Sequence, residues 1–236
     1  DSRKLKDKKG YDLFNTIFFE RHKEILMRSA KNFSLIILII IIVLGVLSFY
    51  NNDIHNNIHA FLLNRLGWFV LIMYLINRGS VVTQAMFYNC DHAMLRYNFY
   101  REPDVILGLF KKRLTMLIKI NLLPAIVIAI GSIVLLGITT NGSLVINYII
   151  VLSVFFSVHY LVIYYLLQPY NKDLQVKGIS YTFVSFITLV LTYILSNLVM
   201  SSLYFSILGI VLTVAYIIVS LKLVYKYAPS TFRIHA

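Results

Sequence analysis

Long hydrophobic runs alternate with short polar segments along this chain, and six of the runs are long enough to cross a bilayer. About 20 apolar residues in a helix span the hydrocarbon core. The third run contains Pro124, which is expected to kink its helix. The pattern therefore predicts an all-α, polytopic membrane protein with six transmembrane helices. Their expected positions are 32–50, 66–86, 115–138, 144–167, 179–199 and 203–225.

The residues ahead of the first hydrophobic run follow a different pattern. Residues 1–10 form a basic tail, and from Tyr11 to Lys31 apolar residues recur at helical spacing with Arg, Lys and Glu between them. A basic amphipathic helix before a span is typical of the inner membrane interface, and a cytoplasmic packing helix is the alternative. We therefore divide the chain into this N-terminal part, 1–31, and a six-span transmembrane domain, 32–236.

Composition agrees with a membrane protein. Of the 236 residues, 59% are hydrophobic and 14% are charged, and the mean hydropathy is +0.77, whereas a soluble domain carries about 25% charged residues. Cys90 is the one cysteine, so no intrachain disulfide can form. Because the first residue is Asp1, we expect the numbering to begin inside a longer polypeptide. High usage of Ile, Asn, Lys, Tyr and Phe is typical of an AT-rich genome, such as that of a low-GC Gram-positive bacterium.

The net charge of +12 is informative through its placement. Of the 22 basic residues, nine lie in 1–31, seven in 78–119, two in 168–178 and three in 222–236, which leaves Arg65 alone in the other connections. Short basic loops stay in the cytoplasm. The distribution predicts that both termini are cytoplasmic and that the basic side chains meet anionic lipid headgroups, with no role in binding nucleic acid.

The sequence lacks the motifs of several common enzyme classes. It has no GxxxxGK[ST] phosphate loop, no HExxH zinc motif and no GxSxG nucleophile elbow. None of its ten acidic residues falls within a predicted span, so paired carboxylates for acid–base chemistry are missing there, as is the intramembrane acid typical of a symporter. We expect no catalytic residue, metal or cofactor in this chain and an energy source outside it.

Polar side chains within the spans are the next candidates for function. His159 in the fourth run is either a functional intramembrane group or a histidine bonded to a neighbouring helix. The fifth run carries hydroxyl residues on one helical face, which either line a translocation path or pack against another helix. Both interpretations turn that face toward protein. The stripe consists of Thr182, Ser185, Thr188, Thr192 and Ser196.

A looser cluster lies in the connection after the first span. Asp53, His55 and His59 are close in sequence, with the two histidines four residues apart. Such a group either binds zinc or belongs to a hydrated outer loop. Nearer the cytoplasmic side, Lys119 is placed to extend its ammonium group to the interface.

The segment from Met86 to Asn121 is the one long polar interruption between spans. It carries charges of both signs, several aromatic residues and Pro103, which separates a short helix from a basic helix that leads into the third span. Apolar and aromatic side chains rimmed by charge are typical of a protein-binding surface, and contact with the headgroup boundary is the alternative. We predict that a partner contacts Asp91, Met94, Leu95, Arg96, Tyr97, Phe99, Tyr100, Arg101 and Pro103.

The order of features in this segment resembles the coupling-helix loop of six-span ABC exporter permeases. The amphipathic helix before the first span is similar to that family's connecting helix, and six spans with both termini inside also match. Two features depart from the family: the loop is richer in aromatics and arginine, and the short link between the last two spans has no room for a re-entrant hairpin. The matching residues are Asp91, Leu95, Pro103, Val105, Ile106 and the basic run 111–113.

The resemblance implies the permease subunit, or half, of an ATP-driven exporter of the Gram-positive peptide or toxin type. A separate cytoplasmic ABC ATPase, which would hold ATP and Mg²⁺, is expected to dock on the coupling loop 87–114. A second six-span half, as a homodimer, a heterodimer or a fused repeat, is expected to complete the path through the cell membrane. The alternative is an ATPase-independent membrane enzyme, immunity protein or signalling protein. Its polar groups within the spans would be His159, Asn77, Asn147 and Asn197.

Overall fold

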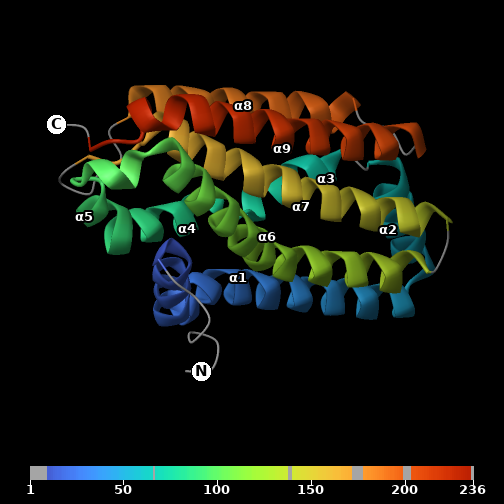
Figure 1. Ribbon diagram of the computed structural model, residues 1–236. Coiled ribbons are helices and arrows are strands. Elements are labelled where there is room, and N and C mark those ends of the chain that lie inside the picture. The colour runs from blue at the N-terminus through green and yellow to red at the C-terminus, as the bar shows by residue number, and fades with distance from the viewer. Residues whose placement is uncertain (1–9, 66, 138–139, 172–177, 199–202, 235–236) are drawn as a thin grey trace.

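The computed structural model describes residues 10–65, 67–137, 140–171, 178–198 and 203–234, and these residues form helices with no strand among them. The basic tail 1–9 and the predicted span ends at 66, 138 and 199 lie outside the described residues. The elements in chain order are α1 (Gly10–Tyr50), α2 (Asn52–Asn64), α3 (Trp68–Ile76), α4 (Gly79–Met86), η2 (Phe87–Asp91), α5 (His92–Met94), η3 (Asn98–Arg101), α6 (Pro103–Leu136), α7 (Thr140–Leu167), α8 (Ile179–Leu198) and α9 (Leu203–Thr231) (Figure 1).

The prediction of six spans is confirmed, because six helical segments in the described part of the chain are long and apolar enough to cross a membrane. Several are longer than expected. The third begins at Pro103, the first residue of α6, where a proline is well tolerated because its missing N–H would have had no partner. Asp104 follows in the first turn, where a carboxylate favours the helix dipole.

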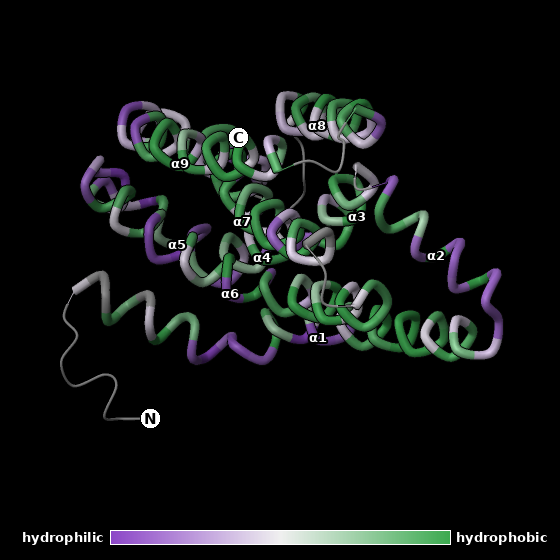
Figure 2. Tube along the Cα trace, turned by 90° about the vertical axis from the view of Figure 1, so that its right-hand side faces the viewer, coloured by the Kyte–Doolittle hydropathy of each residue, from purple (hydrophilic) through white to green (hydrophobic). Residues whose placement is uncertain are grey.

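The amphipathic segment and the first span belong to one long helix, α1 (Gly10–Tyr50). Figures 1 and 2 show the first turns of α1 at a steep angle to its apolar remainder, so the two parts run in different directions. The angled part packs on the rest of the bundle through Phe18, Phe19 and Leu26, which are buried. The beginning of α1, the end of α9 and α5 all lie at the same end of the bundle (Figure 1).

The second span is interrupted at Asn77 and Arg78, where we had expected one continuous helix. The free carbonyl groups of Leu75 and Ile76 at the end of α3 accept hydrogen bonds of 2.9 Å each from the Arg78 guanidinium. Asn121 of α6 accepts the backbone N–H of Arg78 at 2.8 Å. A break at membrane depth is tolerated where side chains of neighbouring helices satisfy the backbone in this way.

Helix α7 lies in the middle of the bundle, with α6 below it and with α8 and α9 on its upper side (Figure 2). Helix α8 reaches the bundle through α3. The two approach closely at Gly67, just before α3, where an added Cβ would lie 2.0 Å from the carbonyl oxygen of Ser196. Only a glycine fits there, and this contact fixes one wall of a cavity described below.

Candidate functional site

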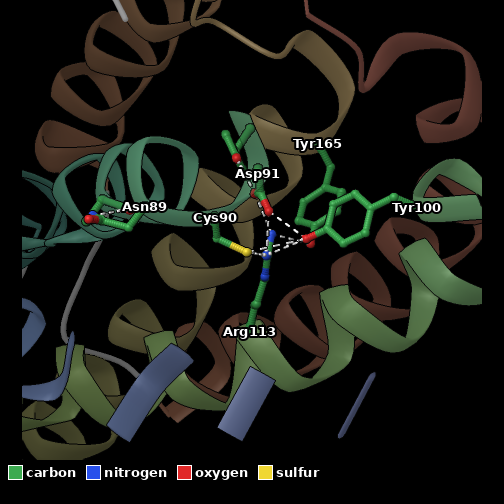
Figure 3. A network of polar contacts seen from close by, with 8 residues as sticks. Asn89, Cys90, Asp91, Tyr100, Arg113 and Tyr165 are labelled. Atoms are coloured by element: carbon green, nitrogen blue, oxygen red, sulfur yellow. Dashed lines mark hydrogen bonds and ion pairs between the residues drawn. The ribbon is translucent and has the colours of Figure 1, made fainter. Parts of the chain in front are cut away.

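A buried ion pair joins the second and third spans near the end of the bundle that carries α5 (Figure 3). Asp91 of η2 and Arg113 of α6 are both fully buried. Nη1 and Nη2 of Arg113 donate to the two carboxylate oxygens of Asp91 at 2.6 Å each. This two-point geometry is the strongest arrangement of an arginine and a carboxylate, and burial makes each charge depend on the other.

Three tyrosine hydroxyls complete the surroundings of the pair. Tyr100 donates to Oδ1 of Asp91 at 2.7 Å, and Tyr164 of α7 donates to Oδ2 at 2.5 Å. Arg113 donates to the hydroxyl of Tyr165 at 3.0 Å. The sulfur of Cys90 lies 3.8 Å from Nη2 of Arg113. We call these six residues, Cys90, Asp91, Tyr100, Arg113, Tyr164 and Tyr165, the Asp91 centre.

Burial raises the pKa of Tyr100 well above its ordinary value, more than the nearby Arg113 charge lowers it. The phenol therefore stays protonated and keeps donating its hydrogen bond to Asp91. The Nε atom of Arg113 is buried and has no hydrogen-bond partner. The centre thus holds one negative charge, one positive charge and neutral donors.

The local backbone explains why neighbouring side chains both point inward. Residues Phe87–Asp91 form a π-helical turn, and Phe87, Cys90 and Asp91 are all buried. A π-turn inserts one extra residue into a helix, a feature often found at functional sites. It is followed by α5, and the chain then returns through η3, which carries Tyr100 back to Asp91.

The structure divides the predicted contact residues of the coupling segment into three groups. Asp91, Leu95 and Tyr100 are buried, which corrects the expectation that they offer surface to a partner, because Asp91 and Tyr100 are bound within the Asp91 centre. Met94 and Arg101 are half-buried. The exposed members are Arg96, Tyr97, Phe99 and Pro103.

The exposed aromatic pair forms the apolar part of that surface. The rings of Tyr97 and Phe99 are stacked, with centroids 5.8 Å apart, and the two residues are 56% and 40% exposed. Arg101 donates to the side chain of Asn98 between them at 2.6 Å, which holds the turn together. We call the exposed residues Arg96, Tyr97, Phe99 and Pro103 the loop surface.

The expectation that no acidic residue falls within a span is wrong at Asp91. The helical segment of the second span runs from Trp68 to Met94 and includes Asp91. A signal was present in the sequence. Arg113 follows Ile106 and Phe110 and precedes Leu117 at helical spacing, so it lies on an apolar stripe and not with Lys111 and Lys112, which the sequence places beside it.

The hydroxyl stripe of the fifth span faces the protein over most of its length, as predicted. Thr192 and Ser196 are buried, Ser185 and Thr188 are half-buried, and Thr182 is exposed. The structure brings His159 of α7 to this stripe, because Nε2 of its ring lies 3.0 Å from the hydroxyl of Thr188.

The hydrogen bonds around His159 define its tautomer. The hydroxyl of Thr188 donates its one hydrogen to the carbonyl oxygen of Val184 at 2.8 Å, so it must accept from Nε2 of His159. In the neutral ring, Nδ1 then accepts from the Tyr216 hydroxyl of α9, 3.0 Å away. His159 thus has a partner on both ring nitrogens and joins α7 to α8 and α9.

The outer cluster of Asp53, His55 and His59 lies on α2 (Asn52–Asn64). Nδ1 of His55 is 2.7 Å from the hydroxyl of Ser48, and the two histidine rings are 6.2 Å apart. The described residues contain no group of three His, Cys, Asp or Glu side chains able to hold a metal ion.

Arg78 lies inside the predicted second span, 66–86, but the sequence analysis counted it with the basic connection 78–119 and did not predict its role. Its guanidinium lies 3.8 Å from the centre of the Phe33 ring of α1 and caps the broken end of α3. Asn121, the partner of its backbone N–H, also donates to the hydroxyl of Ser157 of α7 at 2.9 Å. The break therefore connects spans one to four.

Comparisons with models of protein families, with curated protein sequences and with solved structures give no match to this chain. The fold and the arrangement of these residues define the class, a polytopic helical membrane protein with a buried charged centre at one end of the bundle.

Proposed function

We propose that this chain is the transmembrane permease subunit, or one half, of an ATP-driven exporter. The observation that supports the proposal most directly is the contrast in burial between two consecutive residues, Phe99 and Tyr100. Phe99 belongs to the exposed loop surface, whereas Tyr100, the next residue, is fully buried and bonded to Asp91. A partner that contacts the loop surface would thus act on a rigid connection to three spans.

The path of that connection follows from the hydrogen bonds. Tyr100 binds the carboxylate of Asp91 on the second span, Asp91 binds Arg113 on α6, and Tyr164 and Tyr165 on α7 bind both charges. Displacement of η3 would have to move these helices together or break the buried hydrogen bond from Tyr100 to the charged Asp91, which is costly. A displacement of the loop surface would therefore be transmitted through the Asp91 centre to these helices.

This connection between the loop surface and the spans is suited to a partner protein that supplies energy. The chain has no phosphate-loop motif of its own, so ATP and Mg²⁺ would be held by a separate cytoplasmic ABC ATPase docked on the loop surface. In this orientation the end of the bundle with α5 and the end of α9 faces the cytoplasm, in agreement with the placement of basic residues. A second six-span unit would complete the path.

The substrate we propose is amphipathic, such as a peptide or toxin. An apolar cavity beside His159 faces the hydroxyl stripe and is described below. None of the residues that line it is charged. The alternative of a membrane enzyme has less support, because the two charges of the Asp91 centre are directed at each other and at tyrosines, with both side chains fully buried.

A copurification experiment tests the ATPase partner. The native membrane protein is tagged and purified in mild detergent, bound proteins are identified by mass spectrometry, and ATP hydrolysis by the complex is measured. We expect a protein with a phosphate-loop motif to copurify with the wild type. Tyr97→Asp places a charge in the loop surface and should reduce its recovery and the ATPase activity at least tenfold.

The matched control is Tyr227→Asp, the same change at a 44% exposed tyrosine of α9, which should leave recovery unchanged. Leu95→Asp is unsuitable as a test because Leu95 is buried and its replacement would disturb folding. Absence of any phosphate-loop protein with the wild type, or full recovery with Tyr97→Asp, would overturn the proposal.

A further inference from the structure

A cavity of about 320 Å³ lies between α7, α8 and α9. Its floor is α7, and its two sides are α8 and α9, which lie over the same side of α7 in Figure 2. The lining includes Val151 and Phe155 of α7, Leu195 of α8, and Leu208 and Gly209 of α9. The cavity is independent of the Asp91 centre and of any ATPase partner.

The lining positions place the cavity between the middle of the bundle and its α2 end. Apart from Val70 of α3, they lie between Tyr148 and His159 on α7, between Thr188 and Leu195 on α8, and between Phe205 and Thr213 on α9. These are the middle of α7, the second half of α8 and the beginning of α9, and the α8 and α9 positions lie toward the end of the bundle with α2. His159 is the lining residue of α7 that lies deepest from that end.

The chemistry of the lining selects an apolar occupant. None of the sixteen lining residues is charged. The polar groups at the deep end already have partners, because His159 is bonded on both ring nitrogens and Thr188 and Thr192 donate to carbonyl groups of their own helix. A headgroup or a charged peptide would find no free donor among these groups, whereas a hydrocarbon chain needs none.

The size of the cavity suits a slender occupant. Its volume of about 320 Å³ falls at the lower end of the 300–1,000 Å³ range of small-ligand sites. One extended, flexible hydrocarbon chain is compatible with that volume.

We propose that this cavity binds one acyl chain of a membrane lipid from the leaflet at the α2 end of the bundle. The chain enters between α8 and α9, lies along α7 and ends near His159. The headgroup stays at the membrane surface. The acyl chain fills space between α8 and the rest of the bundle and so fixes the position of α8.

The structure offers a substitution that fills the cavity without disturbing the helices. A Cβ added at Gly209 would meet only the Val151 side chain at 3.6 Å, an ordinary contact, so Gly209→Leu projects its added atoms into the cavity. Gly45 of α1 is the matched control, because an added Cβ there meets nothing within 4 Å and the residue lies in an exposed stretch of the first span.

The test uses the full chain in phosphatidylcholine vesicles that contain a small fraction of phospholipid with a diazirine at the end of one acyl chain. After illumination, mass spectrometry locates the labelled residues. We expect labelling of cavity residues such as Phe155 and Leu208 to fall at least fivefold in Gly209→Leu and to stay unchanged in Gly45→Leu. Labelling of exposed residues of α1 should be equal in all three proteins.

Three results would overturn the proposal. The first is equal cavity labelling in wild type and Gly209→Leu. The second is equal labelling in Leu195→Trp, which fills the cavity from α8 and serves as an independent variant if Gly209→Leu fails to fold. The third is efficient disulfide dimerisation of Leu208→Cys in vesicles, because this would show that a helix of a second copy occupies the gap between α8 and α9.

Discussion

The ring of Phe232 stacks on the ring of Tyr165, with centroids 4.5 Å apart and planes at 24°. Phe232 directly follows α9, so this contact brings the last described turn of the chain against the Asp91 centre. Phe232 is fully buried, and it also meets the edge of Tyr164 at 5.2 Å. The sixth span is thereby joined to the same tyrosines that hold the Asp91–Arg113 pair.

Removal of the Phe232 ring should weaken the packing around the Asp91 centre. Phe232→Ala leaves a cavity beside two tyrosines, and truncation of a buried phenylalanine costs about 3–5 kcal/mol. We expect a clear fall in the thermal unfolding temperature in detergent. Tyr225→Ala, at a 45% exposed position of α9, is the control and should change it little. Equal effects of the two variants would show that Phe232 has no special role.

The ion pair itself gives a sharper prediction. Asp91→Asn keeps the shape of the side chain but leaves the buried Arg113 charge without its partner, which costs about 3–5 kcal/mol. Replacement of both residues by Leu should cost less than Asp91→Asn alone, because no charge then remains buried. Thermal unfolding of Asp91→Leu, Arg113→Leu and the double variant measures this coupling, with Asp91→Asn as the comparison that keeps the side-chain shape. If the losses simply add, the two charges do not depend on each other.

Much of the fold could be predicted from the sequence because span length and hydropathy are local properties. The six runs became six helical segments, and the helix start at Pro103 follows from the rules for proline at a first turn. The break at Asn77 and Arg78 could not be predicted in the same way. Besides the side chains of Asn77 and Arg78, which bond to the backbone at the break, it depends on Asn121, more than 40 residues later, which accepts the backbone N–H of Arg78.

At the candidate site, too, contacts between residues far apart in the chain could not be predicted from the sequence. The sequence predicted a contact surface in the segment from Met86 to Asn121, and Tyr97 and Phe99 in that segment are exposed. It also placed Asp91 and Tyr100 on that surface, whereas their partner is Arg113, a residue 22 positions from Asp91. Burial of a charge depends on where the opposite charge lies in space, and spacing along one helix does not give that information.

Tyr100 predicts a dependence of stability on alkaline pH. Burial raises the pKa of Tyr100 in the folded protein above its unfolded value of about 10. Its contribution is therefore fully present below pH 10 and is lost as the pH rises above 10 toward the folded pKa, since the unfolded state then binds fewer protons. The unfolding temperature of the wild type should fall more steeply as the pH rises above about 10 than that of Tyr100→Phe.

Tyr100→Phe also removes the hydrogen bond to Asp91 at all pH values. At pH 8 we expect a loss of about 1–3 kcal/mol, because a buried charged acceptor loses one donor. The difference between the two proteins should shrink above pH 10. A difference that stays constant over the whole range would show that Tyr100 titrates equally in the folded and unfolded states.

The break in the second span gives the last prediction. Asn121→Ala removes the acceptor for the backbone N–H of Arg78 and the donor to Ser157. An unsatisfied buried group costs about 1–3 kcal/mol, and the cost should be local, because the break separates α3, which supports α8, from α4, which leads to the Asp91 centre. We expect faster hydrogen exchange of the amides of Arg78 and Gly79 in Asn121→Ala.

Asn197→Ala is the matched control, since the amide of Asn197 is exposed and its bonds stay within α8. If the break acts as a hinge between the two halves of the span, exchange in α3 and α4 away from the break should stay unchanged. Uniformly faster exchange through both halves would indicate general loosening of the bundle. No change at Arg78 would show that the Asn77 and Arg78 side chains hold the break without Asn121.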